Sequence, residues 1–256
     1  VVIVWPRIGP AFCVVVLIDG PVYALPPFAA EQADIIAAAA ELSSWFREQN
    51  QPLYIKGLEQ SIAELLAEAF PQWTIEHERC EDDYIYSVKE LIELKGRKFE
   101  AKRHHIRTFL KNTPVYSYEA MNPENALECL PVARRWLECQ QSDDRILQAE
   151  MFAEEQALTQ FAELGLSGGI IRIGSDIKAF TVGEALCEDT AVIHIEKADP
   201  EVVGLYQMIN REYLAQAWPH MTFVNREEDM GIPGLRAAKM SYRPVRMVEK
   251  YSARGE

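Results

Sequence analysis

One apolar segment of the chain is followed without interruption by four charged residues, which makes it the richest candidate for chemistry. Residues 221–225 have the pattern of a buried strand, and Arg226, Glu227, Glu228 and Asp229 come next, before a glycine-rich loop. Strand ends are where α/β proteins place ligand groups. Glu227 or Glu228 could act as a general base toward an attacking amine or hydroxyl, and Arg226 could hold a carboxylate or a phosphate. The alternative is a solvated charge run or a network of ion pairs.

A second pair of candidates lies at the end of a strand predicted over residues 189–196. Side chains alternate between the two faces of a strand, so His194 and Glu196 are expected to share a face. Either could act as a base or orient a substrate. The alternative is a structural histidine whose hydrogen bonds are satisfied within the fold.

The chain also contains a basic segment, residues 95–111, with seven lysines or arginines and one acid. Its net charge of +6 leaves −19 for the rest of a chain whose formal net charge is −13. On a helix, Lys102 falls on the apolar arc next to Lys98, whereas Arg103 lies on another side. Because a cation on the apolar side of a helix needs a partner, we expect these residues to bind phosphate groups. A tRNA end, a coenzyme A tail or a lipid headgroup would supply them; the alternative is ion pairing with the acidic remainder.

A fourth candidate is the connection at residues 198–204, between a predicted strand and a predicted helix. Backbone N–H groups at a helix N-terminus can cradle a pyrophosphate, and the helix that follows this connection would supply them. However, Asp199 and Glu201 would repel phosphate. The alternative is a plain connection with no ligand.

These groups must be positioned by two predicted α/β lobes, residues 1–112 and 113–256. The first lobe begins with a strand at residues 11–19, a turn at residues 19–21 and a hairpin partner at residues 22–25. Its other predicted elements are helices at 30–49 and 58–70, short strands at 53–55, 73–78 and 84–86, and helices at 88–94 and 96–111.

The second lobe alternates strands and helices after an antiparallel meander, which indicates a mixed sheet covered on both faces. Its predicted strands are residues 115–119, 168–173, 178–184, 189–196, 221–225 and 246–251. Its predicted helices are residues 123–140, 146–164, 202–218 and 233–240. The fold class is therefore α/β, with mixed sheets in two lobes.

Composition excludes several classes of protein. Five cysteines without a C-x-x-C spacing argue against a disulfide framework or a zinc ribbon, and five scattered histidines give no metal-ligand pattern. The acidic balance argues against sequence-specific DNA binding. No apolar run approaches the roughly 20 residues of a membrane-spanning helix, and no signal peptide is present, so we expect a cytoplasmic protein.

Two groups of motifs resemble a known family. The first group is DYIYSV at residues 83–88, LKGRKF at 94–99 and KRHHI at 102–106. The second is IEKAD at 195–199, GLYQMIN at 204–210, VNREEDMG at 224–231 and GLRAAK at 234–239, closing with Lys250 and Tyr251. These motifs resemble the family of soluble bacterial proteins with a phosphatidylglycerol lysyltransferase C-terminal domain.

The resemblance implies two lobes with the fold of GNAT acyltransferases and an ancestry in acyl or aminoacyl transfer. It also implies that Lys239 contacts a ligand. The usual glycine-rich pyrophosphate pattern of GNAT proteins is missing here, and of it only Gly204 remains.

We therefore expect a transferase that moves an acyl group onto an amine or hydroxyl, without a tightly bound cofactor. Its donor would be an aminoacyl-tRNA or a small acyl-CoA. In this hypothesis Lys98, Lys102 and Glu227 line the groove between the two lobes. The alternative is a catalytically inactive ligand-binding module on a GNAT scaffold.

Overall fold

The computed structural model describes residues 2–4, 7–17, 22–139 and 145–255. The chain forms two compact units, each assembled from segments that are distant in sequence. The first comprises Val1–Asp83, Glu228–Arg236 and Met247–Glu256, and the second comprises Tyr84–Glu227 and Ala237–Arg246. This division differs from the expected ranges 1–112 and 113–256, because the basic helix packs in the second unit and the last strand returns to the first.

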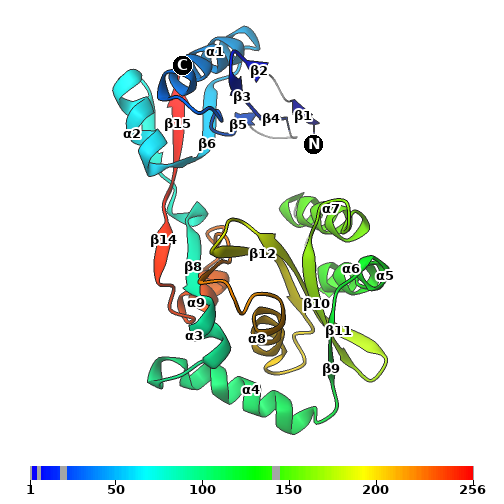
Figure 1. Ribbon diagram of the computed structural model, residues 1–256. Coiled ribbons are helices and arrows are strands. Elements are labelled where there is room, and N and C mark those ends of the chain that lie inside the picture. Colours follow the sequence, from blue (N-terminus) through cyan, green and yellow to red (C-terminus); the bar gives the residue numbers. More distant parts are fainter. Residues whose placement is uncertain (1, 5–6, 18–21, 140–144, 256) are drawn as a thin grey trace. The chain divides into compact units, whose positions relative to one another are not determined.

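A mixed sheet of six strands forms the centre of the first unit, in the order β1–β4–β5–β6–β15–β7 (Figure 1). The strands are β1 (Val2–Val4), β4 (Val15–Leu17), β5 (Tyr23–Ala24), β6 (Leu53–Glu59), β7 (Thr74–His77) and β15 (Lys250–Gly255). A small separate pair is formed by β2 (Arg7–Ile8) and β3 (Ala11–Phe12).

This sheet contains strands from both ends of the chain. Strands β4 and β5 pair antiparallel, as the predicted hairpin requires, while its turn at residues 19–21 lies outside the described residues. Strand β15 pairs antiparallel with both β6 and β7. The single strand predicted at residues 246–251 is thus wrong. It is divided into β14 (Arg246–Val248), which belongs to the sheet of the second unit, and β15.

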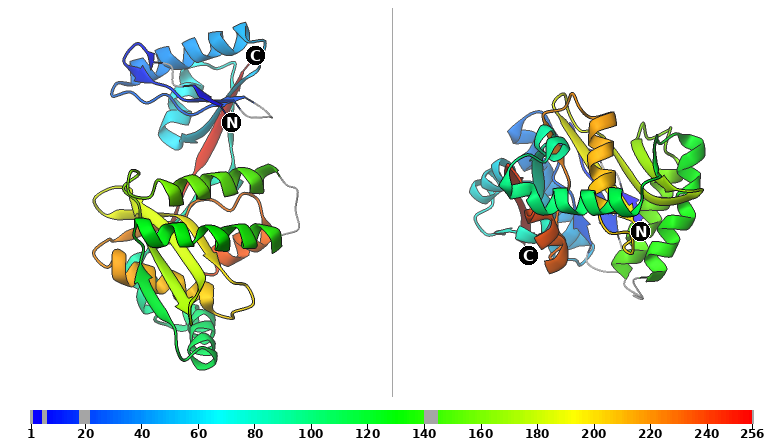
Figure 2. Two further views of the ribbon diagram at one scale, coloured as in Figure 1. Left: turned by 90° about the vertical axis from the view of Figure 1, so that its right-hand side faces the viewer. Right: turned by 90° about the horizontal axis from the view of Figure 1, so that it is seen from below.

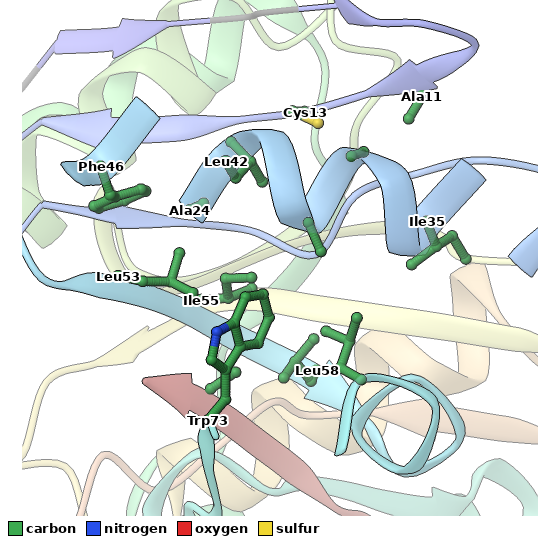
Figure 3. Packing of buried hydrophobic residues seen from close by; sticks show 14 of the residues in the cluster. Ala11, Cys13, Ala24, Ile35, Leu42, Phe46, Leu53, Ile55, Leu58 and Trp73 are labelled. Carbon is green, nitrogen blue, oxygen red and sulfur yellow. The ribbon is translucent and has the colours of Figure 1, made fainter. Parts of the chain in front are cut away.

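The core of the first unit lies between its sheet and helices α1 (Gln32–Glu48) and α2 (Gln60–Ala69), both predicted from their apolar period. Figure 3 shows Leu42 and Phe46 of α1 above Leu53 and Ile55 of β6, with Trp73 beside Ile55. Full burial of a leucine or phenylalanine contributes about 1.5–3 kcal/mol. These contacts therefore fix α1 on the sheet.

The second unit contains a sheet of seven strands in the order β14–β8–β13–β12–β11–β10–β9. The remaining strands are β8 (Asp83–Ser87), β9 (Ser117–Ala120), β10 (Ser167–Ile173), β11 (Asp176–Ala185), β12 (Thr190–Ala198) and β13 (Phe223–Asn225). Strands β10, β11 and β12 form the predicted antiparallel meander, and β12 and β13 are parallel. The sheet is mixed, as predicted.

Helices cover both faces of this sheet. On one face α5 (Pro123–Glu128), α6 (Leu130–Cys139) and α7 (Arg145–Thr159) pack on β10–β12, and Figure 2 shows α6 and α7 across that face. The other face carries α8 (Leu205–Ala217), which Figure 1 places on the opposite side of the strands. The single helix predicted at residues 123–140 is thus divided into α5 and α6.

Three further helices complete the second unit: α3 (Val88–Glu93), α4 (Glu100–Asn112) and α9 (Pro233–Met240), whose first residues belong to the first unit. Helices α3 and α4 both pack on α8. The buried residues of α4 are Lys102, Ile106 and Phe109. This confirms the predicted position of Lys102 on the apolar arc. In the described ranges, no helix combines the length and apolar character needed to cross a bilayer.

Candidate active site

The candidate site begins where the parallel strands β12 and β13 separate. They pair only from Thr190 opposite Phe223 to Val192 opposite Asn225, although β12 continues to Ala198. One residue further along β12, the ladder to β11 skips a position, since Ile193 pairs with Gly183 and Ile195 with Val182. His194 is the extra residue of this β-bulge, and bulges re-aim side chains and often lie next to active sites.

The bulge corrects the expectation that His194 and Glu196 share a face. His194 lines a cavity together with Ile195, on the side of α7. Glu196 instead bonds Asn210 of α8 on the other side of the sheet, with 2.8 Å between the amide nitrogen and the carboxylate oxygen. Strand alternation fails here because the bulge inserts one residue into the period of two.

His194 lies between two carboxylates. Its Nδ1 is 2.7 Å from Glu227 Oε1, and its Nε2 is 3.1 Å from Glu184 Oε1. The hydrogen bond to Glu227 is the main cause that raises the pKa of His194 above its ordinary value, and Glu184 adds to it. About a third of the His194 side chain is exposed, so a protonated imidazole meets solvent between two acids.

Glu227 itself has a left-handed backbone, with φ at 54°, which is unusual for a residue with a side chain. Three contacts hold this conformation. The backbone N–H of Glu227 donates to Asn225 Oδ1 at 2.7 Å, and its carbonyl accepts from the Tyr84 N–H at 3.2 Å and from Lys239 Nζ at 3.1 Å. A strained residue that is held this firmly is typical of a functional site.

A cavity of about 440 Å³ adjoins these groups and is bounded by α7, β11 and β12. Its polar lining consists of His194 and four glutamates: Glu150, Glu154, Glu184 and Glu227. Apolar side chains such as Leu164, Leu166 and Val182 form the rest. Among the described residues, no group of three or more histidines, cysteines or acids is placed to hold a metal ion.

The deepest acid of the cavity is Glu154, which is buried. Burial raises the pKa of Glu154 to about 7, and the nearby Lys197 opposes this shift. Lys197 Nζ lies 3.0 Å from Glu154 and 2.8 Å from Glu150. The cavity is thus lined by four carboxyl groups and one histidine, and even with Lys197 paired to two of these acids its balance is negative.

A second cluster lies on the α8 side, around the guanidinium of Arg226. Arg226 Nη2 is 2.7 Å from Glu196 Oε1, and the guanidinium lies 4.9 Å from the centre of the Tyr242 ring and 5.8 Å from that of Tyr86. Its Nη1 is buried and makes no hydrogen bond within the described residues. Arg226 is therefore held inside the unit, and Glu227, its neighbour, faces the cavity.

Lys102 reaches the same cluster from α4. Its Nζ donates to Ser241 Oγ at 2.6 Å and lies 3.7 Å from the centre of the Tyr242 ring. Burial lowers the pKa of Lys102 to about 8, and the charge of Arg226 adds to the effect. The basic helix thus places one cation inside the unit, as its pattern predicted.

The structure does not bring Lys98 and Arg103 to this cluster. Lys98 is on the surface and pairs with Glu90 at 2.6 Å. The guanidinium of Arg103 donates to the carbonyl groups of Leu94 and Gly96, where α3 ends, and pairs with Glu100. Neither side chain therefore joins Lys102 in the cluster around Arg226.

Gly204 begins α8 with φ at 87°, and an added Cβ would lie 2.1 Å from the carbonyl oxygen of His105. Helix α4 therefore covers the N-terminus of α8, and close packing by itself explains the glycine. Lys239 donates to the carbonyl groups of Arg226 and Glu227. Glu228 opens the segment of the first unit that carries the buried Asp229.

Sequence reasoning missed Glu150, Glu154 and Glu184 as members of the site. Glu184 ends the predicted strand at residues 178–184, so the sequence could have predicted that it lies beside the next strand of the meander. Glu150 and Glu154 lie on α7 and approach β12 only through tertiary packing. Their spacing in the sequence does not identify them as site residues.

Solved structures share this architecture. A conserved protein of unknown function from Bacteroides thetaiotaomicron is 32% identical, with a TM-score of 0.88, over 98% of this chain and 85% of that one. L-PGS from Bacillus licheniformis is 13% identical, with a TM-score of 0.68, over 96% and 81%. A tandem GNAT protein from the clavulanic acid biosynthesis pathway is 12% identical, with a TM-score of 0.53, over 97% and 81%. The last two show the fold alone.

The fold is thus a tandem GNAT-like fold, with mixed sheets in two units, as expected. The chain belongs to the family described as phosphatidylglycerol lysyltransferase, C-terminal, whose model matches residues 2–254. An uncharacterized protein of Mycoplasmoides gallisepticum is 24% identical over 173 residues, or 66% of the chain. The chain spans about half of that relative, 54% of its length.

Proposed function

We propose that the second unit transfers an aminoacyl group from an aminoacyl-tRNA onto an amine or hydroxyl acceptor. The observation that carries this proposal is the Glu227–His194–Glu184 array at the bulge of β12, beside a cavity with four glutamates. Membership of a family named for lysyl transfer supports it.

The cavity suits a substrate that carries an ammonium group. Its carboxylates outnumber the positive charges of His194 and Lys197, and its aliphatic walls suit the carbon chain of such a substrate. A cationic aminoacyl group, such as lysyl, has both features. We therefore propose that the cavity holds the cationic end of the substrate.

The reacting groups would act as follows. The acceptor nitrogen or oxygen attacks the ester carbonyl, a new C–N or C–O bond forms, and the bond to the ribose oxygen of the tRNA breaks. Glu227 accepts the proton of the acceptor, and the protonated His194 donates its Nε2 proton, which faces Glu184 in the resting site, to the leaving ribose oxygen. Nδ1 keeps its own proton toward Glu227, so Glu227 then releases the acquired proton to solvent and His194 Nε2 regains one from solvent, which reaches about a third of both side chains.

The α4 region supports a tRNA donor over coenzyme A. The exposed cations Lys95, Arg97, Lys98, Arg107 and Lys111 form a positive surface for a polyanion. At the N-terminus of α8, by contrast, the carbonyl of His105 occupies the place that a pyrophosphate would approach. No tightly bound cofactor is part of the proposal.

A transfer assay tests this function. The protein is incubated separately with lysyl-tRNA, alanyl-tRNA and acetyl-CoA, and with amine and lipid acceptors. Transfer from lysyl-tRNA is expected, and Glu227→Gln should reduce it about 100-fold or more, the size of a general-base contribution. Glu188→Gln, an exposed acid in the turn before β12, is the matched control and should leave the rate unchanged. Transfer that survives Glu227→Gln at full rate refutes the assignment.

The alternative is a ligand-binding module without catalysis. The observation in its favour is that both nitrogens of His194 already contact carboxylates. It predicts that lysyl-tRNA or a free diamine raises the melting temperature while no transfer occurs with any donor. Transfer by the wild-type chain eliminates it.

A further inference from the structure

The first unit contains a cavity of about 560 Å³, far in sequence from the groups described above. Helix α1 contributes Ala40, Ser43, Ser44 and Arg47, and the chain between α2 and β7 contributes Phe70, Gln72 and Trp73. Thr74 of β7 and the end of β15 complete the lining. The volume lies in the range of small-molecule sites, about 300–1,000 Å³.

Two nearly buried side chains of this cavity, Ser43 and Trp73, make no hydrogen bond with the described part of the chain. Ser43 is 7% exposed and Trp73 is 8% exposed. Neither the Ser43 hydroxyl nor the Trp73 indole N–H makes a hydrogen bond with any part of the chain that the structure describes. Neither atom is among the fully buried polar atoms without a partner, so the hydroxyl and the N–H reach the solvent of the cavity. Both donors are therefore available to a ligand with acceptor atoms.

Ser44 provides the contrast on the same helix. Its hydroxyl donates to the carbonyl of Ala40 at 3.2 Å, so it is satisfied within α1. Ser44 therefore offers no free donor to a ligand, whereas Ser43 does.

The charges of the lining favour an anion. Of the residues that the structure describes, no acid lines the cavity, whereas Arg47 and Arg254 do. Arg254 already pairs with Glu76 at 2.9 Å and Glu78 at 3.0 Å. The exposed Arg47 makes no ion pair with the described residues, so its guanidinium is available for a carboxylate or phosphate.

Aromatic rings form the remaining wall. The rings of Phe70 and Trp73 stack with their centres 4.0 Å apart and their planes 12° apart. An added Cβ at Gly255 would lie 2.8 Å from Cδ1 and 2.9 Å from Nε1 of Trp73, so β15 fixes the indole from behind. A rigid aromatic stack beside unpaired donors suits a planar ring.

We propose that this cavity binds a small anion that carries a planar ring, of the size of a nucleoside monophosphate. The anionic group pairs with Arg47, acceptor atoms meet the Ser43 hydroxyl and the Trp73 N–H, and the ring packs on Phe70. This site is separate from the proposed transfer chemistry and does not depend on it.

Calorimetric titration of the full chain with AMP tests the proposal, with adenosine as the uncharged probe. AMP is expected to bind, and adenosine at least about tenfold more weakly, because it lacks the charge that Arg47 meets. Arg47→Gln should weaken AMP binding about tenfold or more, the loss of one charge-assisted hydrogen bond. Ser43→Ala should weaken it about fivefold.

Glu188→Gln and Glu227→Gln, both outside the cavity, are the controls, and both should bind AMP as the wild type does. Arg47 is on the surface, so its variant should keep the wild-type melting temperature. The proposal is overturned if AMP does not bind at millimolar concentration, if adenosine binds equally well, or if Arg47→Gln and Ser43→Ala leave affinity unchanged.

Discussion

Replacing Gly204 by alanine tests whether α4 covers the N-terminus of α8. An added Cβ would lie 2.1 Å from the His105 carbonyl oxygen and 2.8 Å from its carbon, far inside contact distance. The positive φ of 87° destabilises the folded state by about 1–2 kcal/mol for any residue with a Cβ. Overpacking of this kind destabilises the folded state by about a further 1–3 kcal/mol. Together the two effects should lower the free energy of unfolding by about 2–5 kcal/mol.

Gly174→Ala is the matched control. Gly174 also has a positive φ, 64°, but an added Cβ there would meet nothing within 4 Å. Its variant should therefore show the backbone strain alone, about 1–2 kcal/mol. The difference between the two variants isolates the contact with α4.

Differential scanning calorimetry measures both variants. For a unit of this size each kcal/mol corresponds to about 2–4 °C in melting temperature, so Gly204→Ala should melt about 2–12 °C below Gly174→Ala. Equal melting temperatures would show that nothing presses on Gly204. The argument that the place of a pyrophosphate is covered would then fail.

Two further predictions concern titrating groups. Burial lowers the pKa of Lys102 to about 8. Above pH 8 the unfolded chain therefore binds more protons than the folded chain, so the free energy of unfolding should rise with pH between about 8 and 10. Lys102→Met should remove this rise, which urea unfolding at several pH values would show; an unchanged slope would contradict a buried Lys102. Glu227→Gln removes the main cause of the raised His194 pKa, so NMR titration should find that pKa lower than in the wild type. The same variant with an unmoved His194 pKa would mean that the two side chains are not hydrogen-bonded in solution.

Local patterns were sufficient for most elements of the fold. The apolar period of α1 and the succession of the three strands β10, β11 and β12 are local properties, and the structure has them as predicted. The apolar arc of α4 also placed Lys102 correctly, because helix geometry fixes which side chains share a face. Long-range pairing was less accessible: β14 and β15 adjoin in sequence but belong to different sheets.

The sequence by itself determined the family, the tandem α/β fold and several candidate residues, among them His194 and Glu227. Only the tertiary structure decided which of them meet. A bulge of one residue turned His194 away from Glu196, and the packing of α7 brought Glu150 and Glu154 to the cavity. The physical reason is that periodicity fixes direction within one element, whereas contacts between elements depend on pairing register and side-chain packing across the whole unit.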